Sequence, residues 1–400
     1  MEDCIPLALA ASLNGTTTPH TPFTYGDHTA SGPVLDIVSL DSHRNYSSPT
    51  ESGSEQNFKH VEDILYRKVV IGICAFGILG NLLNLIVLTQ KSLQKSMDRM
   101  EKSAHMGLVA MAVSDMLFGT VVLPHAWIEQ KAFMYETKGF EIYYAIYSEA
   151  IINIFILSST LLTVTIATSR YLAIVHPLRA REVIGMTFAR SSIVSVFVIC
   201  VLFNLPRFWN ESIESMKCVG GHTVYFRKEG FLKNNNVFMV FYMWTYFLCG
   251  ILLPLLWLAY CNVYLIRALR QSARMRRQYQ PANNAVREST HRITLTLVVI
   301  VIMYVTLVSP AEIINFLKRM VITHGQITPT YNLIVAVLNT FQAINFSCNF
   351  VLYCAINVHF RQTVRDVFCH FCRKKTPKLV INTSGYYAYD SVNTAATTAV

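Results

Sequence analysis

The sequence predicts an all-α membrane protein, in which a bundle of seven transmembrane helices is followed by an eighth, amphipathic helix at the membrane interface. Of the 400 residues, 52% are hydrophobic and 14% are charged, whereas a soluble globular chain carries about 25% charged residues. Seven separate apolar stretches also provide the ~20 residues that a helix needs to cross a ~30 Å hydrocarbon core. The composition excludes disordered, collagenous and coiled-coil chains, and 10 Cys in 400 residues exclude a small disulfide scaffold.

The seven expected spans are separated by short polar or charged connections, and no internal repeat of fixed period links them. The lack of a repeat argues against a solenoid and against a repeat-built transporter. The spans cover residues 69–88, 105–127, 142–174, 191–208, 237–265, 293–316 and 331–356.

The regions outside this helical domain, which we place at 64–356, are polar. Residues 1–63 are rich in Ser, Thr, Pro, Asn and Gly and predict a disordered tail, and residues 373–400 predict a second one. The acidic start of the chain lacks the basic residues and long apolar run of a cleaved signal peptide. Residues 357–372 predict the interfacial helix, because apolar side chains recur there at helical spacing. These side chains are Phe360, Val364, Val367, Phe368 and Phe371.

Two cysteines, Cys369 and Cys372, close the amphipathic stretch. Cysteines beside such a helix are candidate palmitoylation sites. Reduced cytosolic thiols are the alternative, and the sequence favours neither.

Lysine and arginine are unevenly distributed between alternate connections. With the amino terminus outside, 20 of the 34 lie on the cytoplasmic side, 13 lie outside, and Arg170 lies within a span. Because short cytoplasmic loops are enriched in Lys and Arg, this bias predicts a multi-pass protein with an extracellular amino terminus. It also accounts for the net charge of +10 without nucleic-acid binding. The sequons at Asn14, Asn45 and Asn210 then fall outside, where we expect glycosylation.

Short motifs occur in a fixed order along the spans. They are Gly80-Asn81, Ser114-Asp115, Ser169-Arg170-Tyr171, Pro254, Pro310 and Asn349-Phe-Val-Leu-Tyr353. Together they resemble the rhodopsin-like (class A) G-protein-coupled receptors over residues 64–372. Span seven contains no Lys to hold retinal, and the scattered histidines form no metalloenzyme motif.

Three longer segments narrow the resemblance. The segments FNLPRF at 203–208, HPLRAR at 176–181 and SCNFVLYC at 347–354 are similar to those of invertebrate FMRFamide-receptor-type neuropeptide receptors. This resemblance implies a non-enzymatic plasma-membrane protein that binds a peptide ligand, couples to a heterotrimeric G protein and to arrestin, and lies in membrane lipid. A receptor for another small or peptide ligand is the alternative, and a transporter is a more distant one. The resemblance assigns G-protein coupling to Arg170, Tyr171 and Tyr353.

The cysteine pattern departs from that family. The family has a cysteine at the start of helix three, bonded to the second outer loop. Its expected position here is near Ala145, and no Cys lies between Cys74 and Cys200. We therefore expect the outer-loop Cys218 either to be a free thiol or to pair with Cys4.

One further departure concerns switching, since Ser169 stands where the family has an acidic residue before Arg170. Phe350 replaces the proline of helix seven, a replacement that the peptide-receptor subgroup it resembles shares. A serine offers Arg170 only a neutral hydrogen bond, about half as strong as a charge-assisted one. We therefore expect Arg170 to be more available to a G protein and basal signalling to be raised.

Asp115 is the deepest carboxylate of the predicted bundle, and an ionisable group inside a membrane needs a partner or a cavity. Carboxylate, hydroxyl and amide oxygens suit a small hard cation, and the resemblance implies sodium. A structural polar network with water is the alternative. The polar side chains at comparable depth on other spans are Asn81, Ser159, Asn345 and Asn349.

Glu149 and Glu312 are the notable charges in the outer half of the bundle. The resemblance implies an amidated peptide ligand with an arginine. We expect the two carboxylates to line an acidic, aromatic cavity that binds this arginine, because a buried guanidinium needs a carboxylate. A Glu149 that pairs with a loop Lys is the alternative. The other expected cavity residues are Asn153, Asn315, Asn339, Gln342, Tyr147 and Trp244.

Overall fold

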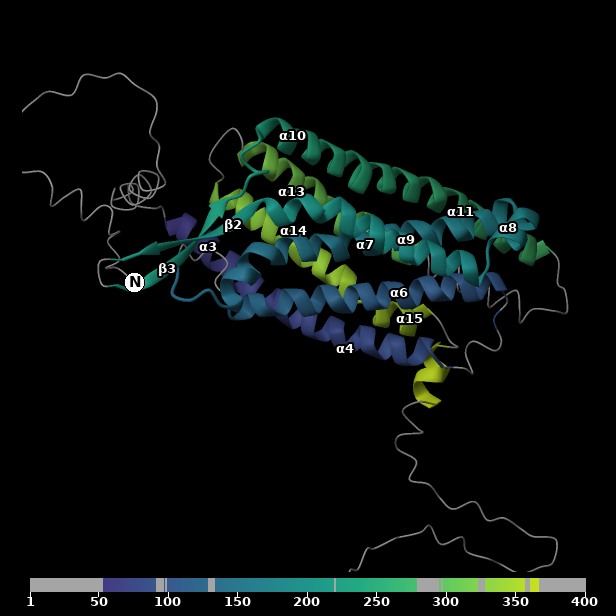
Figure 1. Cartoon of the computed structure of the whole chain (residues 1–400). Helices are drawn as coiled ribbons and strands as arrows, with labels where there is room; N and C mark the ends of the chain where they lie inside the picture. The colour runs from purple at the N-terminus through teal and green to yellow at the C-terminus, as the bar shows by residue number, and fades with distance from the viewer. Residues whose placement is uncertain are drawn as a thin grey trace, which may run out of the picture.

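The computed structural model is an elongated helical bundle with a small β-sheet at one end and the short helix α8 (Pro177–Val183) at the other (Figure 1). We call these the sheet end and the α8 end. The structure describes residues 53–90, 99–128, 134–218, 221–278, 298–322, 328–356 and 360–366, together with positions 97 and 295.

The long helices follow one another along the chain in the order that the sequence predicts. Several of these helices continue into, or begin with, a π-helical or 3-10 segment along the same chain direction. The elements are α3 (Gly53–Ile64), η1 (Leu65–Val69) and α4 (Val70–Leu88); α6 (Arg99–Val122) and η2 (Leu123–Ala126); α7 (Phe140–Val175); α9 (Met186–Asn204) and η3 (Leu205–Trp209); α10 (Asn236–Thr245), η4 (Tyr246–Leu252) and α11 (Leu253–Gln278); η5 (Tyr304–Val308) and α13 (Ser309–Ile322); and α14 (Pro329–Ser347) and α15 (Asn349–Ile356).

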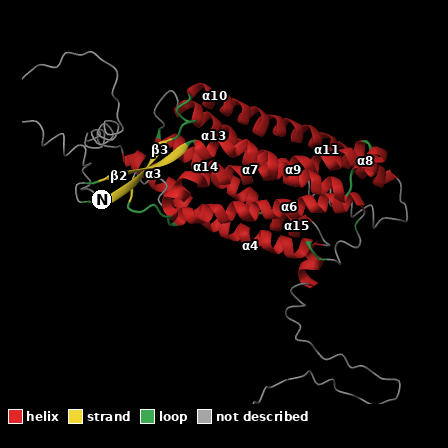
Figure 2. Cartoon of the chain, in the orientation of Figure 1, coloured by secondary structure: helices red, strands yellow, loops and turns green. Residues whose placement is uncertain are grey.

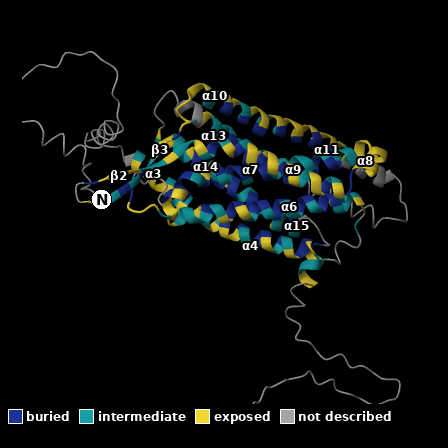
Figure 3. Ribbon diagram, in the orientation of Figure 1, coloured by how far each residue is buried: buried dark blue, intermediate teal, exposed yellow. Residues whose placement is uncertain are grey.

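Within the described residues, six helices are long and apolar enough to cross a membrane, and the bent pair α14 and α15 supplies a seventh span. The two halves of this pair meet at 52°. Large apolar side chains such as Phe76, Leu79 and Leu202 are more than half exposed on the outside of the bundle, where Figure 3 shows many exposed positions. Such a surface is suited to lipid. The predicted bundle of seven membrane helices is confirmed.

One boundary of the sequence prediction is wrong. The first helix begins at Gly53 rather than at residue 64, so residues 53–63 belong to the bundle and not to a tail. This segment is polar because it extends beyond the apolar span, and α3 packs against α14. Composition alone cannot distinguish such a helical extension from a polar tail. The rest of the amino-terminal tail and residues 373–400 lie outside the described residues.

The predicted eighth helix lies only partly within the described residues. Residues 360–366 are helical. Phe360 is 1% exposed and contacts the ring of Tyr353, with ring centroids 5.5 Å apart. This side chain therefore packs into the bundle. Cys369 and Cys372 lie outside the described residues, as do Asn14 and Asn45.

The bend in the seventh helix occurs without a proline. Cys348 interrupts the helix between α14 and α15, and its N–H donates to the carbonyl of Ile344. The neighbouring α4 approaches closely at this point, since a Cβ on Gly77 would lie 2.3 Å from Ser347 Oγ. Only glycine fits this contact without displacing the end of α14.

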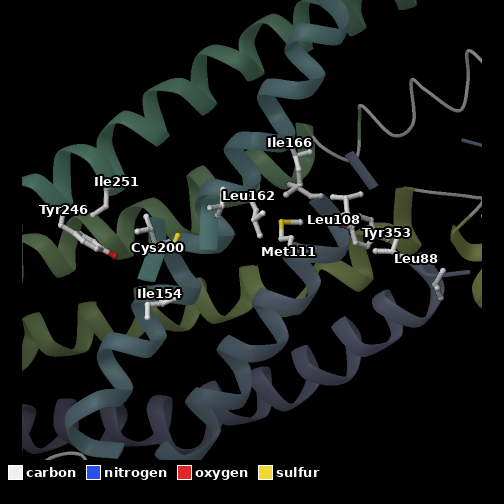
Figure 4. Close-up of a cluster of buried hydrophobic side chains, with 14 of the residues drawn as sticks. Leu88, Leu108, Met111, Ile154, Leu162, Ile166, Cys200, Tyr246, Ile251 and Tyr353 are labelled. Atoms are coloured by element: carbon white, nitrogen blue, oxygen red, sulfur yellow. The ribbon is translucent and has the colours of Figure 1, made fainter. Parts of the chain in front are cut away.

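The apolar core joins the middle helices of the bundle (Figure 4). Leu108 and Met111 of α6 pack with Leu162 and Ile166 of α7 in one buried cluster. This cluster extends to Cys200 of α9 and to Tyr353 of α15. It gives the two functional ends of the bundle a common rigid centre.

A three-stranded antiparallel sheet at the sheet end was not predicted (Figure 2). Its strands β1 (Met134–Tyr135), β3 (Thr223–Glu229) and β2 (Glu211–Lys217) lie in that order. The β2–β3 hairpin pairs Glu211 with Glu229 and Lys217 with Thr223. Adding β1 ties the connection before α7 to this hairpin, which follows η3.

An apolar cluster anchors the sheet to the start of α7. Tyr135 of β1 packs with Ile142, Ala145 and Ile146 of α7, and the hairpin contributes Ile213. Ala145 is 6% exposed and occupies the position expected for the family's cysteine. Strand pairing and apolar packing therefore hold the hairpin where a disulfide to this helix is absent.

Replacing Ile142 with alanine should destabilise this end of the protein. Ile142 is 0% exposed, and truncating a buried isoleucine to alanine costs about 2–5 kcal/mol. We expect Ile142→Ala to melt at a lower temperature than the parent in detergent. The measurement is thermal unfolding followed with a probe that does not react with cysteine. Phe140→Ala is the matched control, because Phe140 lies on the same helix end and is 67% exposed. Equal destabilisation by both substitutions would contradict the anchoring role of the cluster.

Cys218 is disulfide-bonded, so the free-thiol alternative for this residue is wrong. Its partner lies outside the described residues, because the other described cysteines are free thiols. These are Cys74, Cys200, Cys249, Cys261, Cys348 and Cys354.

We predict that the partner of Cys218 is Cys4, since Cys4 is the remaining cysteine on the predicted outer side of the membrane. Cys4→Ser should expose a maleimide-reactive thiol at Cys218 without reduction. Peptide mapping of the unreduced protein should recover the Cys4–Cys218 crosslink. A mapped bond from Cys218 to Cys369 or Cys372 would refute the assignment.

Candidate functional site

A cavity of about 470 Å³ lies between the helices towards the sheet end. This volume falls within the range of about 300–1,000 Å³ typical of small-ligand sites. Six of the eight residues expected for the ligand site line it. They are Glu149 and Asn153 of α7, Glu312 and Asn315 of α13, and Asn339 and Gln342 of α14.

Glu312 is a carboxylate fixed in the wall of the cavity. It is 7% exposed, and Gln342 Nε2 donates to its Oε1 at 2.7 Å. The donor is a neutral amide, and this hydrogen bond orients the carboxylate. A carboxylate oriented in this way can accept a charge-assisted hydrogen bond from a cationic ligand.

Amide side chains connect three helices beside Glu312. Asn315 Nδ2 donates to Asn339 Oδ1 at 3.1 Å. Asn339 Nδ2 donates in turn to the hydroxyl of Tyr66 in η1 at 2.9 Å. This chain of hydrogen bonds fixes α13, α14 and the first helix relative to one another, so the cavity wall is preorganised.

Glu149 is paired with a helical arginine. Arg207 Nη1 of η3 lies 3.2 Å from Glu149 Oε1. The guanidinium also lies 4.5 Å from the ring centroid of Tyr246 and 5.8 Å from that of Tyr242, within cation–π range. A loop Lys is the alternative partner that the sequence predicts for Glu149, and the structure has Arg207 instead.

Arg207 is a charged cavity residue that the sequence did not predict. In the sequence it stands among the outer basic residues and within the segment FNLPRF. The neighbouring Pro206 is a sequence signal for a turn, because it fixes the backbone at the start of η3. The proline does not show which way the side chain of Arg207 points. Its inward direction follows from the packing of η3 against α7.

Two expected ligand residues do not line the cavity. Tyr147 stacks on Tyr143 and Phe208, with centroids 6.3 and 5.8 Å away. Trp244 is 46% exposed on α10, and its ring contacts Phe316. Each residue lies at the predicted depth but on another face of its helix. The aromatic rings in the described lining are Tyr66, Phe118, Tyr242, Tyr246 and Phe316.

Two of the four predicted partners of Asp115 donate to its carboxylate. Ser159 Oγ donates to Asp115 Oδ1 at 3.0 Å, and Asn349 Nδ2 donates to Asp115 Oδ2 at 2.6 Å. Asn81 bonds to the backbone of the seventh helix instead, since its Nδ2 donates to the carbonyl of Phe346 in α14 at 2.9 Å. The backbone carbonyl of Asn345 accepts from Cys348 Sγ.

Comparison with known families agrees with this arrangement. The family described as 7 transmembrane receptor (rhodopsin family) matches residues 80–357, which is more than half of the chain. The chain belongs to the rhodopsin family of seven-transmembrane receptors. It is therefore a receptor in a membrane and not an enzyme, as the motifs predicted.

Individual relatives of this rhodopsin-family receptor are distant. It is 25% identical to the FMRFamide receptor of Drosophila melanogaster, over 75% of this chain and 52% of that receptor. It thus spans about half the length of that relative. It is 25% identical to sex peptide receptor-related protein 2 of Caenorhabditis elegans, over 78% of this chain and 73% of that protein. It is 26% identical to the B1 bradykinin receptor of Canis lupus familiaris, over 87% and 95%.

The α8 end of the receptor carries the residues expected to couple to a G protein. Arg170 and Tyr353 are 6% and 3% exposed. Tyr171 is half-buried and turns towards α11, where its hydroxyl lies 3.2 Å from that of Tyr260. Ser169 Oγ donates to the carbonyl of Ile166 at 2.8 Å, so its hydroxyl bonds to its own helix.

Ser169→Asp should lower the basal signalling of this receptor. A carboxylate beside Arg170 can form a charge-assisted hydrogen bond that the serine does not provide. The difference is about 1 kcal/mol, or roughly fivefold in the resting equilibrium. Basal second-messenger output at matched surface expression measures it. Ser169→Ala is the control and should resemble the parent, because the hydroxyl bonds to Ile166. If Ser169→Asp and Ser169→Ala give equal basal output, the idea fails.

Proposed function

We propose that this receptor binds a short peptide with an arginine near an amidated aromatic end, and that it relays binding to a heterotrimeric G protein and to arrestin. The observation that carries the proposal is the Glu312 carboxylate, which accepts a hydrogen bond from Gln342 in a cavity large enough for the end of a peptide. The similarity to a protein named FMRFamide receptor supports the same ligand class.

The chemistry of the two peptide groups fits the lining. A guanidinium presents paired donors that match a carboxylate in geometry as well as in charge. An amidated end is neutral, so it avoids the repulsion that a free carboxylate would meet from Glu312. The aromatic ring can pack against Phe316 or Tyr246, and such aromatic pairs are worth about 0.5–1.5 kcal/mol beyond burial.

Glu312→Gln should weaken an arginine-bearing agonist at least tenfold. Removing one partner of a buried hydrogen-bonded charge pair costs about 2–5 kcal/mol, and glutamine keeps the shape of the side chain. A concentration–response curve for an amidated Arg-Phe peptide measures the effect. A citrulline analogue should be weak on the parent and lose little more on Glu312→Gln.

Glu141→Gln is the matched control, because Glu141 is an exposed carboxylate in the first turn of α7 and does not line the cavity. An unchanged half-maximal concentration for the arginine peptide on Glu312→Gln would make Glu312 structural and overturn the proposed ligand. Glu149→Gln is a poorer test, since it also removes the carboxylate that pairs with Arg207.

We also propose that the receptor lies in the plasma membrane with an extracellular amino terminus and with sugars on Asn14, Asn45 or Asn210. The distribution of Lys and Arg supports this orientation. An amino-terminal epitope should stain intact cells, and glycosidase treatment should lower the apparent mass. Staining that appears only after permeabilisation would overturn the orientation.

We also propose two accessory features, a sodium site at Asp115 and palmitoylation near the end of the eighth helix. The Asp115 carboxylate, with the hydroxyl of Ser159 and the amide of Asn349, offers oxygens that suit a sodium ion. Within the described residues, no cluster of His, Cys, Asp and Glu suits another metal. Cys369 and Cys372 are proposed palmitate carriers that would bind membrane lipid.

A further inference from the structure

Arg207 is a fixed part of the cavity wall. Its side chain is 3% exposed, whereas that of Glu149, its ion-pair partner, is 68% exposed. A buried guanidinium beside an open carboxylate is an unequal pair. The arginine is held by the protein, and the carboxylate faces the space that a ligand would enter.

Aromatic and amide groups from three helices hold this arginine. The Tyr246 ring lies 4.5 Å from the guanidinium, and the Tyr246 hydroxyl donates to Asn153 Oδ1 at 3.4 Å. Asn153 Nδ2 donates to the carbonyl of Glu149 at 2.7 Å. Arg207, Tyr246, Asn153 and Glu149 therefore form a closed ring of contacts, which fixes the arginine before any ligand arrives.

The charges in the described lining do not cancel. Glu149 and Glu312 supply two carboxylates, and Arg207 supplies one guanidinium. The pair of Arg207 with Glu149 is neutral as a unit. The other carboxylate, Glu312, accepts a hydrogen bond from the uncharged Gln342. The described lining thus has a formal charge of −1.

We propose that Arg207 is the specificity-determining residue of this cavity: by pairing with Glu149 from within, it sets the lining charge at −1 and selects ligands that insert a single cationic group. The inference rests on the proposed function only for the identity of the ligand. In a peptide end with two cationic groups, one group can pair with Glu312. The other would find Glu149 already paired with Arg207 and would add little affinity. Without Arg207, both carboxylates would attract cations.

The cavity charge can be measured without knowing the ligand. A cysteine at Ile152, a half-buried lining residue, is labelled with a cationic or an anionic methanethiosulfonate of similar size. Phe316→Cys on α13 is a second reporter. The ratio of the two labelling rates reports the local potential, and the parent without the new cysteine gives the background. Mildly alkaline pH keeps the lining residue His125 neutral.

Arg207→Gln should raise the cationic-to-anionic rate ratio by roughly tenfold, and Glu312→Gln should lower it by a similar factor. Arg207→Lys should leave the ratio unchanged, since it keeps the charge. Arg227→Gln is the matched control, because Arg227 pairs with Glu211 on the hairpin and does not line the cavity. The double variant Arg207→Gln with Glu149→Gln restores the net charge and should restore the parental ratio.

Several outcomes would overturn the inference. One is an unchanged ratio in Arg207→Gln when Glu312→Gln lowers it. Another is an equal rise in Arg227→Gln, which would mean that the effect is not local. Absence of labelling at both reporters would show that no charged group enters the cavity. The double variant guards against misfolding, because lost structure would not restore the ratio.

A ligand series then separates this inference from the proposed function. Amidated peptides carrying citrulline, one arginine or two arginines near the end are compared on the parent and on Arg207→Gln. The parent should favour one arginine, and the variant should favour two by at least a tenfold relative gain. If no peptide activates the parent, the proposed ligand is wrong, while the labelling ratios still decide the role of Arg207.

Discussion

The structure depends on one constraint: a charged or polar side chain inside an apolar bundle must find its partners within the bundle, because lipid offers none. Asp115 meets this requirement with a hydroxyl from α7 and an amide from α15. The amide belongs to Asn349, the first residue after the bend in the seventh helix. Satisfying one carboxylate thus joins three helices and fixes where the last one changes direction. The close approach of Gly77 to Ser347 lets the first helix pack against that bend.

The same constraint governs the sheet end, with a different result. Arg207 is as buried as Asp115, yet its carboxylate partner is largely exposed to the cavity. Aromatic faces supply the rest of its surroundings. A charge that would be costly in lipid is thereby held at the edge of a wet site. The charge of the cavity therefore depends on this ion pair.

The sequence predicted those features that depend on length, depth and chain order. The seven spans, two of the partners of Asp115 and six cavity residues follow from the apolar periodicity and from position along each helix. Features set by rotation about a helix axis or by contacts between distant segments did not follow. Tyr147 and Trp244 lie at the expected depth but face Phe208 and Phe316. Strand β1 escaped prediction because it has two residues and exists only through its pairing with β3.

The hairpin and the cavity are also mechanically connected through Arg207. The N–H of Asn210 donates to the carbonyl of Arg207, and the N–H of Gly230 donates to the carbonyl of Asn210. A Cβ on Gly230 would lie 2.1 Å from the Trp209 carbonyl oxygen, so the base of the hairpin is packed directly on the η3 turn. Displacement of the hairpin therefore moves the backbone that carries Arg207. Since no disulfide ties this hairpin to α7, the strand pairing and the cluster around Ile142 limit that displacement. The packing that stands in place of the helix-three disulfide thereby also fixes the position of the arginine that pairs with Glu149 in the cavity.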